Sequence, residues 1–359
     1  MALFDFDTAD SAQPQTKVHA LFNRTRAFGH AKRKEWPEPA IQLQEDDKAL
    51  LALVHRYRIL DTKTLRQLVR VLVKGESAQE TVKLTPSGTA SKAAEVAFAT
   101  RLRQLWRSYH LDRPPEQLYL KITGVEPHLL WALGRKGYEL LAPELALAVD
   151  HYRARRMTQK NSEIKASTLA HDLGSNKARA CIELATHGHA LVRLIYWSTQ
   201  GTKFTLIPPE HQLRLFKAAS EKRLTVVPDG LYGLEHLNEP PPNRAHFYWE
   251  FDNGTTPLPR WTLKKGLGYG EYFRQGLCSR QRAFKSFTVL LVAPTPARKE
   301  SMRTSIARWL QDARHAGSEY PPNLWWFTDR TQYTLDRPAS VLAPIWQTAS
   351  GEERHSLLE

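Results

Sequence analysis

Cysteine and long apolar runs are scarce in this sequence. The 359 residues include 2 cysteines, too few to cross-link a chain of this length, which excludes a disulfide-rich scaffold and fits a reducing compartment. No apolar run approaches the roughly 20 residues that cross a bilayer. The opening segment MALFDFDTAD is acidic and lacks the order of a secretory signal. We therefore expect a cytoplasmic protein that does not engage a membrane.

Acidic residues are in the minority as well. Lys and Arg together number 51 against 37 Asp and Glu, and the formal net charge is +14 at pH 7. A field of this sign attracts polyanions, and we expect DNA to be the partner. A basic run near the middle of the chain contains Arg153, Arg155 and Arg156. We predict that these three arginines contact DNA phosphates, with a solvated linker face as the alternative.

Residues 1–44 and 45–145 differ in pattern. The first segment is polar and shows no sustained period, so we predict a flexible basic arm. The second has apolar residues at helical spacing and an alternating stretch at residues 117–122 that reads as a strand. The helical spacing predicts three helices, near residues 45–57, 61–69 and 91–109. Three short helices followed by a strand pair are typical of a winged helix-turn-helix domain.

The third predicted helix has a polar face opposite its apolar stripe. Its members follow the spacing i, i+3, i+4, i+7 and are Thr100, Arg103, Gln104 and Arg107. In a winged helix-turn-helix domain the third helix enters the major groove, where Arg and Gln side chains reach base edges and phosphates. We therefore predict that these four residues contact DNA. The alternative is a small helical domain whose polar face meets only water.

Residues 160–335 are predicted to form an α/β domain, followed by a C-terminal tail at residues 336–359. Helices and strands alternate in this region, which implies a mixed sheet flanked by helices. The strands are expected at residues 191–197, 223–227, 245–251, 287–292 and 323–327, and the helices at residues 162–186, 261–273 and 299–314. The chain as a whole is thus predicted to be a mixed α/β protein.

Acidic residues mark the ends of two of these strands. Asp229 follows the expected strand at residues 223–227, and Glu250 and Asp252 end the next one. If the strands are neighbours, the three carboxylates converge and repel one another unless a cation neutralises them. Oxygen ligands of this kind suit Mg²⁺ or Mn²⁺. Such an ion could polarise a phosphodiester and lower the pKa of an attacking water.

We therefore predict Asp229, Glu250 and Asp252 as metal ligands and catalytic residues. Lys264 and Lys265 follow on the next element, and either lysine could stabilise charge on the phosphate or help activate the water. Turn geometry is the alternative for two of the acids, because Pro-Asp-Gly and Asp-Asn-Gly are common turn sequences.

The second half carries a series of short motifs: His171-Asp172, Pro228-Asp229-Gly230, Glu250-Phe251-Asp252-Asn253-Gly254-Thr255, and Lys264-Lys265 with Tyr269. Following a winged-helix half, these motifs resemble the replication-relaxation family of bacterial plasmids and integrative elements, over about residues 45–330. The second half is similar in layout to the PD-(D/E)XK nuclease superfamily, whose core runs α-β-β-β-α-β.

The resemblance implies roles for individual residues. Asp229 would be the metal-binding aspartate of the second core strand, and Glu250 the acid of the third-strand motif. Asp252 stands where the superfamily has its lysine, so a displaced Lys264 or Lys265 would replace it. The family also implies a role in plasmid replication or DNA relaxation.

Three functions stay open at this point. The first is a DNA-binding protein of a plasmid or integrative mobile element, acting in replication, relaxation or transfer of its DNA. The second is a Mg²⁺- or Mn²⁺-dependent DNA nuclease that uses Asp229, Glu250 and Asp252. The third is a non-catalytic scaffold that recruits plasmid replication or conjugation proteins. A homodimer is among the expected assemblies.

Overall fold

The computed structural model describes residues 40–76, 89–115, 129–144, 156, 159–199, 201–218, 220–282, 284–349 and 351–359. Within this part of the chain, the residues up to Val69 and from residue 89 to Leu173 form one compact unit. Those from Arg70 to residue 76 and from Gly174 onward form a second. None of the described helices is both long and apolar enough to cross a membrane. The predicted strand at residues 117–122 and most of the predicted arm lie outside the described residues.

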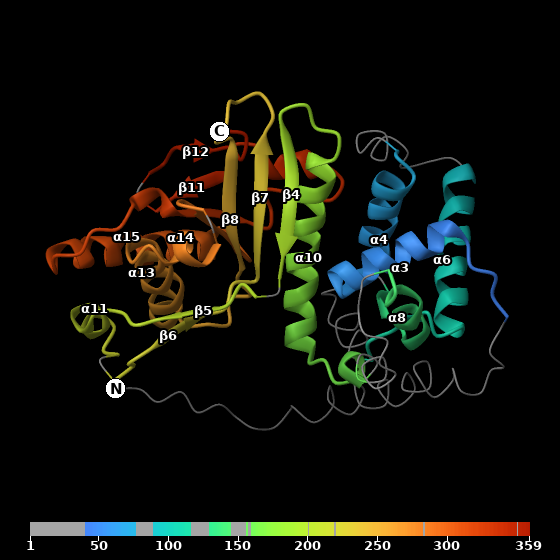
Figure 1. The fold of residues 1–359 in the computed structure, drawn as a ribbon, viewed down its shortest axis with the longest axis horizontal. Coiled ribbons are helices and arrows are strands. Elements are labelled where there is room, and N and C mark those ends of the chain that lie inside the picture. Colours follow the sequence, from blue (N-terminus) through green and yellow to red (C-terminus); the bar gives the residue numbers. More distant parts are fainter. Residues whose placement is uncertain are drawn as a thin grey trace, which may run out of the picture. The chain divides into compact units, whose positions relative to one another are not determined.

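The first unit combines helices with a small antiparallel sheet (Figure 1). Its three strands are arranged in the order β1-β3-β2, with β3 pairing to both neighbours. The elements run along the chain as α3 (Glu45–Tyr57), β1 (Ile59–Asp61), α4 (Thr62–Leu68), α6 (Thr89–Arg107), β2 (Leu111–Asp112), β3 (Leu130–Leu133), α8 (Arg135–Leu141) and the beginning of α10 (Ala166–Thr186), up to Leu173. The π-helical turn η1 (Val69–Val73) follows α4, and all of it after Val69 is grouped with the second unit.

An ion pair attaches α6 to α3. The Arg101 guanidinium donates through Nε to Oδ1 of Asp47 at 2.9 Å, and a second, shorter contact joins the same two side chains. The side chain of Asp47 is only 3% exposed, so the pair is shielded from water on one side. A pair of this kind is costly to break from one side, because the remaining charge stays partly buried without its partner.

An arginine held between two tryptophans joins α6 to the sheet. The Arg113 guanidinium carbon lies 4.4 Å from the ring centre of Trp106 on α6 and 4.5 Å from that of Trp131 on β3. The Trp131 indole in turn donates to the Thr62 hydroxyl at 2.8 Å. These two cation–π contacts of one guanidinium fix the position of α6 against the strands.

The second unit contains a mixed sheet of seven strands in the order β12-β11-β10-β9-β8-β7-β4. Strands β8, β9 and β10 are parallel, and the other neighbours are antiparallel. The strands are β4 (Val192–Ser198), β7 (Gly230–His236), β8 (Arg244–Phe251), β9 (Thr288–Ala293), β10 (Trp325–Asp329), β11 (Trp346–Thr348) and β12 (Arg354–His355). A separate pair, β5 (Phe204–Leu206) and β6 (Leu224–Val226), forms a two-stranded ribbon.

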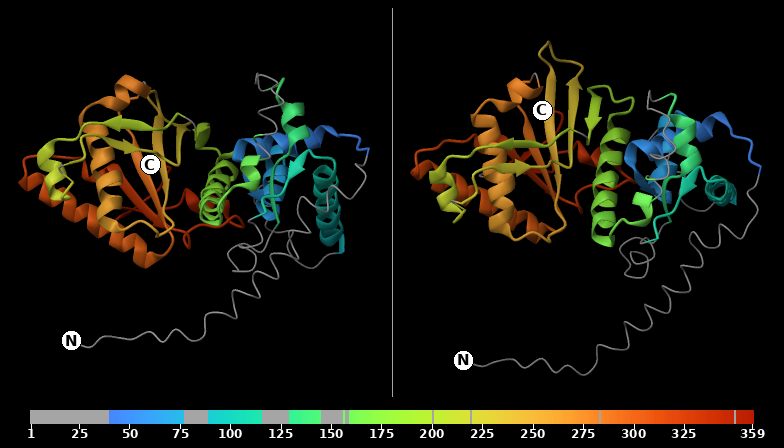
Figure 2. Two further views of the ribbon diagram at one scale, coloured as in Figure 1. Left: turned by 90° about the horizontal axis from the view of Figure 1, so that it is seen from below. Right: turned by 60° about the horizontal axis from the view of Figure 1, so that its bottom comes forward.

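Helices cover both faces of this sheet (Figure 2). One face packs against the helical run after β8 and against the long helix before β10, and the other packs against α10. The helices are α10 (Ala166–Thr186), α11 (Glu210–Leu215), α12 (Leu258–Trp261), η2 (Thr262–Leu267, π-helical), α13 (Gly268–Arg274), α14 (Leu277–Arg282), α15 (Pro296–His315) and the short 3-10 turns η3 (Pro322–Leu324) and η4 (Pro338–Val341).

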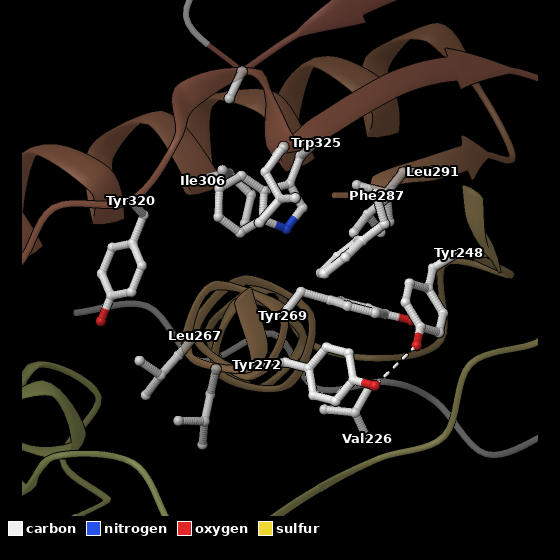
Figure 3. Close-up of a cluster of buried hydrophobic side chains, with 14 of the residues drawn as sticks. Val226, Tyr248, Leu267, Tyr269, Tyr272, Phe287, Leu291, Ile306, Tyr320 and Trp325 are labelled. Carbon is white, nitrogen blue, oxygen red and sulfur yellow. Dashed lines mark hydrogen bonds between the residues drawn. The ribbon is translucent and has the colours of Figure 1, made fainter. Parts of the chain in front are cut away.

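Aromatic side chains fill the core between β8 and α13. Figure 3 shows Tyr269 and Tyr272 of α13 beside Tyr248 of β8, with Trp325 and Phe287 above them. The Tyr248 hydroxyl donates to the Tyr272 hydroxyl at 3.3 Å. Because these rings are almost completely buried, they hold α13 at a fixed position over the sheet.

The predicted strand at residues 223–227 is not a member of the main sheet. Those residues form β6 of the small ribbon, and the second strand of the main sheet is β7, which the sequence analysis missed. Gly230 and Gly233 lower the strand propensity of β7. The structure requires Gly233, because a Cβ there would lie 2.5 Å from the Tyr196 ring.

Residues 336–359 are not a tail. They contribute β11 and β12 to the sheet, and Trp346 and Leu357 are buried in the core on the α10 side. The prediction was wrong because strands of two or three residues carry almost no periodicity. These strands are stabilised by their neighbours in the sheet, since β11 pairs with the edge of β10 and β12 pairs with β11.

We expect Trp346→Ala to lower the free energy of unfolding by about 3–5 kcal/mol, the usual cost of removing a large buried aromatic side chain. The Trp346 side chain is fully buried and donates to the Val341 carbonyl at 3.0 Å. Urea unfolding followed by circular dichroism measures the change, with the exposed Glu353→Ala as the control. A loss similar to that of the control would show that these residues lie outside the core.

Candidate functional site

The residues predicted to contact DNA lie along one side of α6. Thr100, Arg103 and Gln104 are exposed, and Arg107 is half-buried. The Gln104 side chain accepts a hydrogen bond from Arg101 at 3.0 Å. Arg103 forms no hydrogen bond or ion pair in the described part of the chain, so its guanidinium is available to a ligand.

This exposed side of α6 extends further toward the N-terminus than predicted. Ala93, Val96 and Ala97 are also exposed, one to two turns before Thr100. The only acid of α6 is Glu95, and its carboxylate is paired with Arg66 of α4. We call the set Ala93, Val96, Ala97, Thr100, Arg103, Gln104 and Arg107 the α6 face. Its first three members could not be predicted as DNA contacts from hydrogen-bonding capacity, because Ala and Val side chains donate no hydrogen bonds.

The three arginines predicted near the middle of the chain are largely untested. Arg153 and Arg155 lie outside the described residues. Arg156 is exposed and has a helical conformation. Their contact with DNA phosphates therefore stays a prediction.

Asp229 and Glu250 are brought together by the pairing of β7 with β8. Gly230 at the start of β7 lies opposite Trp249 near the end of β8. The backbone N–H of Asp229 donates to the Trp249 carbonyl at 3.1 Å, and Oδ2 of Asp229 accepts from the backbone N–H of Phe251 at 2.7 Å. The predicted juxtaposition of these two acids is therefore found, but Asp229 reaches it from the beginning of β7 and not from the end of a preceding sheet strand.

Glu250 points into the helical layer and meets a lysine and a tyrosine. The Lys265 ammonium lies 2.6 Å from each carboxylate oxygen of Glu250 and also donates to the Val227 carbonyl at 3.0 Å. The Tyr269 hydroxyl donates to Oε1 of Glu250 at 2.5 Å. Lys264, the other predicted candidate, forms no hydrogen bond or ion pair with any described residue.

Burial raises the pKa of Glu250 to about 7, since a charged carboxylate loses its hydration in this position. The Lys265 charge acts against that shift by favouring the ionised form, whereas the charge of Asp229 adds to it. Burial, followed by the charge of Glu250, raises the pKa of the Tyr269 hydroxyl well above its ordinary value, so this tyrosine stays a proton donor.

Asp252 does not join the other two acids. Its Oδ2 accepts from Nε of Arg298, near the start of α15, at 2.8 Å. Its carbonyl accepts from Arg330 at 2.7 Å. Across the described residues, no three His, Cys, Asp or Glu side chains are placed to hold a metal ion. The expected convergence of three carboxylates is therefore not found, because Arg298 provides the counter-charge that the analysis assigned to a cation.

The donor set around Glu250 does not fit Mg²⁺ or Mn²⁺. Both oxygens of Glu250 are bound to the Lys265 ammonium, which repels a cation, and one oxygen of Asp229 is bound to the backbone. A hard divalent cation needs several free oxygen ligands. We therefore derive no metal-dependent step from these residues.

Comparison with known proteins gives one match. A sequence model of the replication-relaxation family matches residues 51–289, which is more than half of the chain, and the chain belongs to this family. Membership indicates a role in the replication or relaxation of plasmid or mobile-element DNA. Neither the curated proteins nor the solved structures contain a significant match.

We expect Glu250 to make the protein less stable as the pH rises from about 4.5 to about 7. Its pKa is raised in the folded state, so the folded chain binds more protons than the unfolded chain in this window, and stability falls with pH. Unfolding in urea at several pH values should show that wild type loses up to about 3 kcal/mol relative to Glu250→Gln across this window.

The exposed Glu353→Gln is the control and should follow wild type at every pH. Parallel pH curves for wild type and Glu250→Gln would contradict the assignment of a raised pKa to Glu250.

Proposed function

We propose that this member of the replication-relaxation family binds the DNA of a plasmid or integrative mobile element through the α6 face, and that this binding serves replication, relaxation or transfer of that DNA. The single observation that carries the proposal is the exposed Arg103, which pairs with no described residue and lies between Thr100 and Gln104 on one side of a well-anchored helix. Arg and Gln side chains in this spacing suit base edges and phosphates.

The architecture of the first unit supports this function. Helices α3, α4 and α6 precede β2 and β3, and β1 completes a sheet of order β1-β3-β2. We infer that this unit is a winged helix-turn-helix domain with α6 as the helix that enters the major groove.

The anchoring of α6 favours binding in a second way. The Arg101–Asp47 pair and the Arg113 sandwich fix the helix before DNA arrives. A pre-ordered helix loses little conformational entropy on binding, so more of the contact energy appears as affinity.

The order of elements in the second unit favours a nuclease-like fold, whereas the side chains around Glu250 do not favour nuclease activity. Its elements α10, β4, β7, β8, α13 and β9 follow the order α-β-β-β-α-β, with β8 parallel to β9. The Glu250–Lys265 ion pair occupies the place where such a fold would hold its metal. We propose that this unit has a structural or DNA-contacting role.

We expect Arg103→Ala to weaken DNA binding about 10-fold or more, because one arginine contact in the groove contributes about 1–3 kcal/mol. Fluorescence anisotropy with labelled duplex DNA at several salt concentrations measures the effect. Wild-type affinity should fall steeply with salt, as binding to phosphates requires.

Arg308→Ala is the matched control, since it removes from α15, in the other unit, an exposed arginine that likewise pairs with no described residue. It should bind DNA almost as well as wild type. Equal affinities for wild type and Arg103→Ala would exclude the α6 face and favour the scaffold alternative.

We expect the purified protein to leave supercoiled plasmid DNA intact in the presence of Mg²⁺ or Mn²⁺, because Lys265 occupies the carboxylate of Glu250. Gel electrophoresis separates supercoiled from nicked plasmid. Nicking that is lost in Glu250→Ala would restore the nuclease alternative, whereas nicking that survives in this variant would indicate a contaminant.

A further inference from the structure

The N-terminal half of α6 exposes an aliphatic residue that the described part of the first unit does not bury. Val96 is 65% exposed, and every residue from 92 to 97 is exposed. Valine is a poorer helix former than alanine. At this position it therefore lowers helix stability without gaining any burial from the described residues.

Val96 belongs to the same side of the helix as the predicted DNA contacts. It precedes Thr100 by four residues and Arg103 by seven, which are the spacings of one helix face. The rise of a helix places Val96 and Arg103 about 10 Å apart along the axis. This distance spans about three base-pair steps of duplex DNA.

The chemistry of the face changes along its length. Ala93, Val96 and Ala97 make the N-terminal half small and apolar, whereas Thr100, Arg103 and Gln104 make the following half polar and basic. No carboxylate interrupts it, because Glu95 is turned to Arg66. The exposed Lys92 flanks the apolar half, so the charge complements a polyanion more than a second copy of this chain.

Duplex DNA presents one apolar group in the major groove, the C5 methyl of thymine. A helix that enters the major groove presents the residues along its groove-facing side to base edges. We propose that Val96, with Ala93 and Ala97 beside it, contacts thymine methyl groups, so that the protein prefers sites with thymine a few base pairs from the position that Arg103 contacts. The proposal rests on the proposed binding of DNA through the α6 face.

The test compares thymine with uracil, which differs from it only by the lack of the methyl group. The full chain first selects tight-binding duplexes from a pool with a random central segment, and the selected duplex is then made with either thymine or uracil throughout. Wild type should bind the uracil duplex about 4-fold more weakly for one lost methyl contact. Val96→Ala should bind both duplexes with nearly equal affinity.

Ile207→Ala is the matched control, because Ile207 is a 66%-exposed β-branched residue in the second unit. It should show the same preference for thymine as wild type. Alanine favours the helix more than valine does, so Val96→Ala should fold, and its circular dichroism spectrum confirms this.

Three results would overturn the proposal and leave the proposed function intact. In the first, uracil and thymine duplexes bind wild type equally while Arg103→Ala still weakens binding. In the second, uracil weakens the binding of wild type and of Val96→Ala by the same factor. In the third, Val96→Ala changes only the oligomeric state in sedimentation. If Arg103→Ala and wild type bind DNA alike, the proposed function itself is excluded.

Discussion

The antiparallel pairing of β7 with β8 brings Asp229 and Glu250 to the same end of the sheet. It sets Gly230 against Trp249 and thereby places Asp229 beside the end of β8. The carboxylate of Asp229 then accepts a hydrogen bond from the Phe251 N–H. From the helical layer, Lys265 and Tyr269 reach Glu250 because the aromatic core holds α13 over this strand. In this geometry the Lys265 ammonium neutralises the charge of Glu250 from within the protein.

The strongest strands could be predicted from the sequence, and one central strand could not. Half of the residues in β8 are Phe, Tyr or Trp, and half of those in β9 are β-branched, so their composition indicates strands directly. In β7, Gly233 is needed beneath the Tyr196 ring, and glycine counts against a strand in any analysis of propensity. The requirement comes from a neighbouring strand that is distant in the sequence.

The positions of Asp229, Glu250 and Asp252 could be predicted only in part, again because some of them depend on residues that are distant in the sequence. Asp229 and Glu250 come close together in any arrangement in which their two segments meet, even though the predicted strand was the wrong one. The position of Asp252 depends on Arg298, which is 46 residues away in the sequence. The choice between Lys264 and Lys265 depends on the π-helical turn of η2, whose i→i+5 hydrogen bonds put more residues in each turn than the regular helical spacing does.

The strands β11 and β12 have a consequence for biosynthesis. Trp346 and Leu357 close the core on the α10 side of the sheet, yet they leave the ribosome after all its other members. Until then the edge of β10 and the ring of Trp249 stay open to water or to chaperones. The first unit has no such dependence, since it ends at Leu173, within α10. The helix that carries Arg103 can therefore reach its final structure while most of the second unit is still being translated.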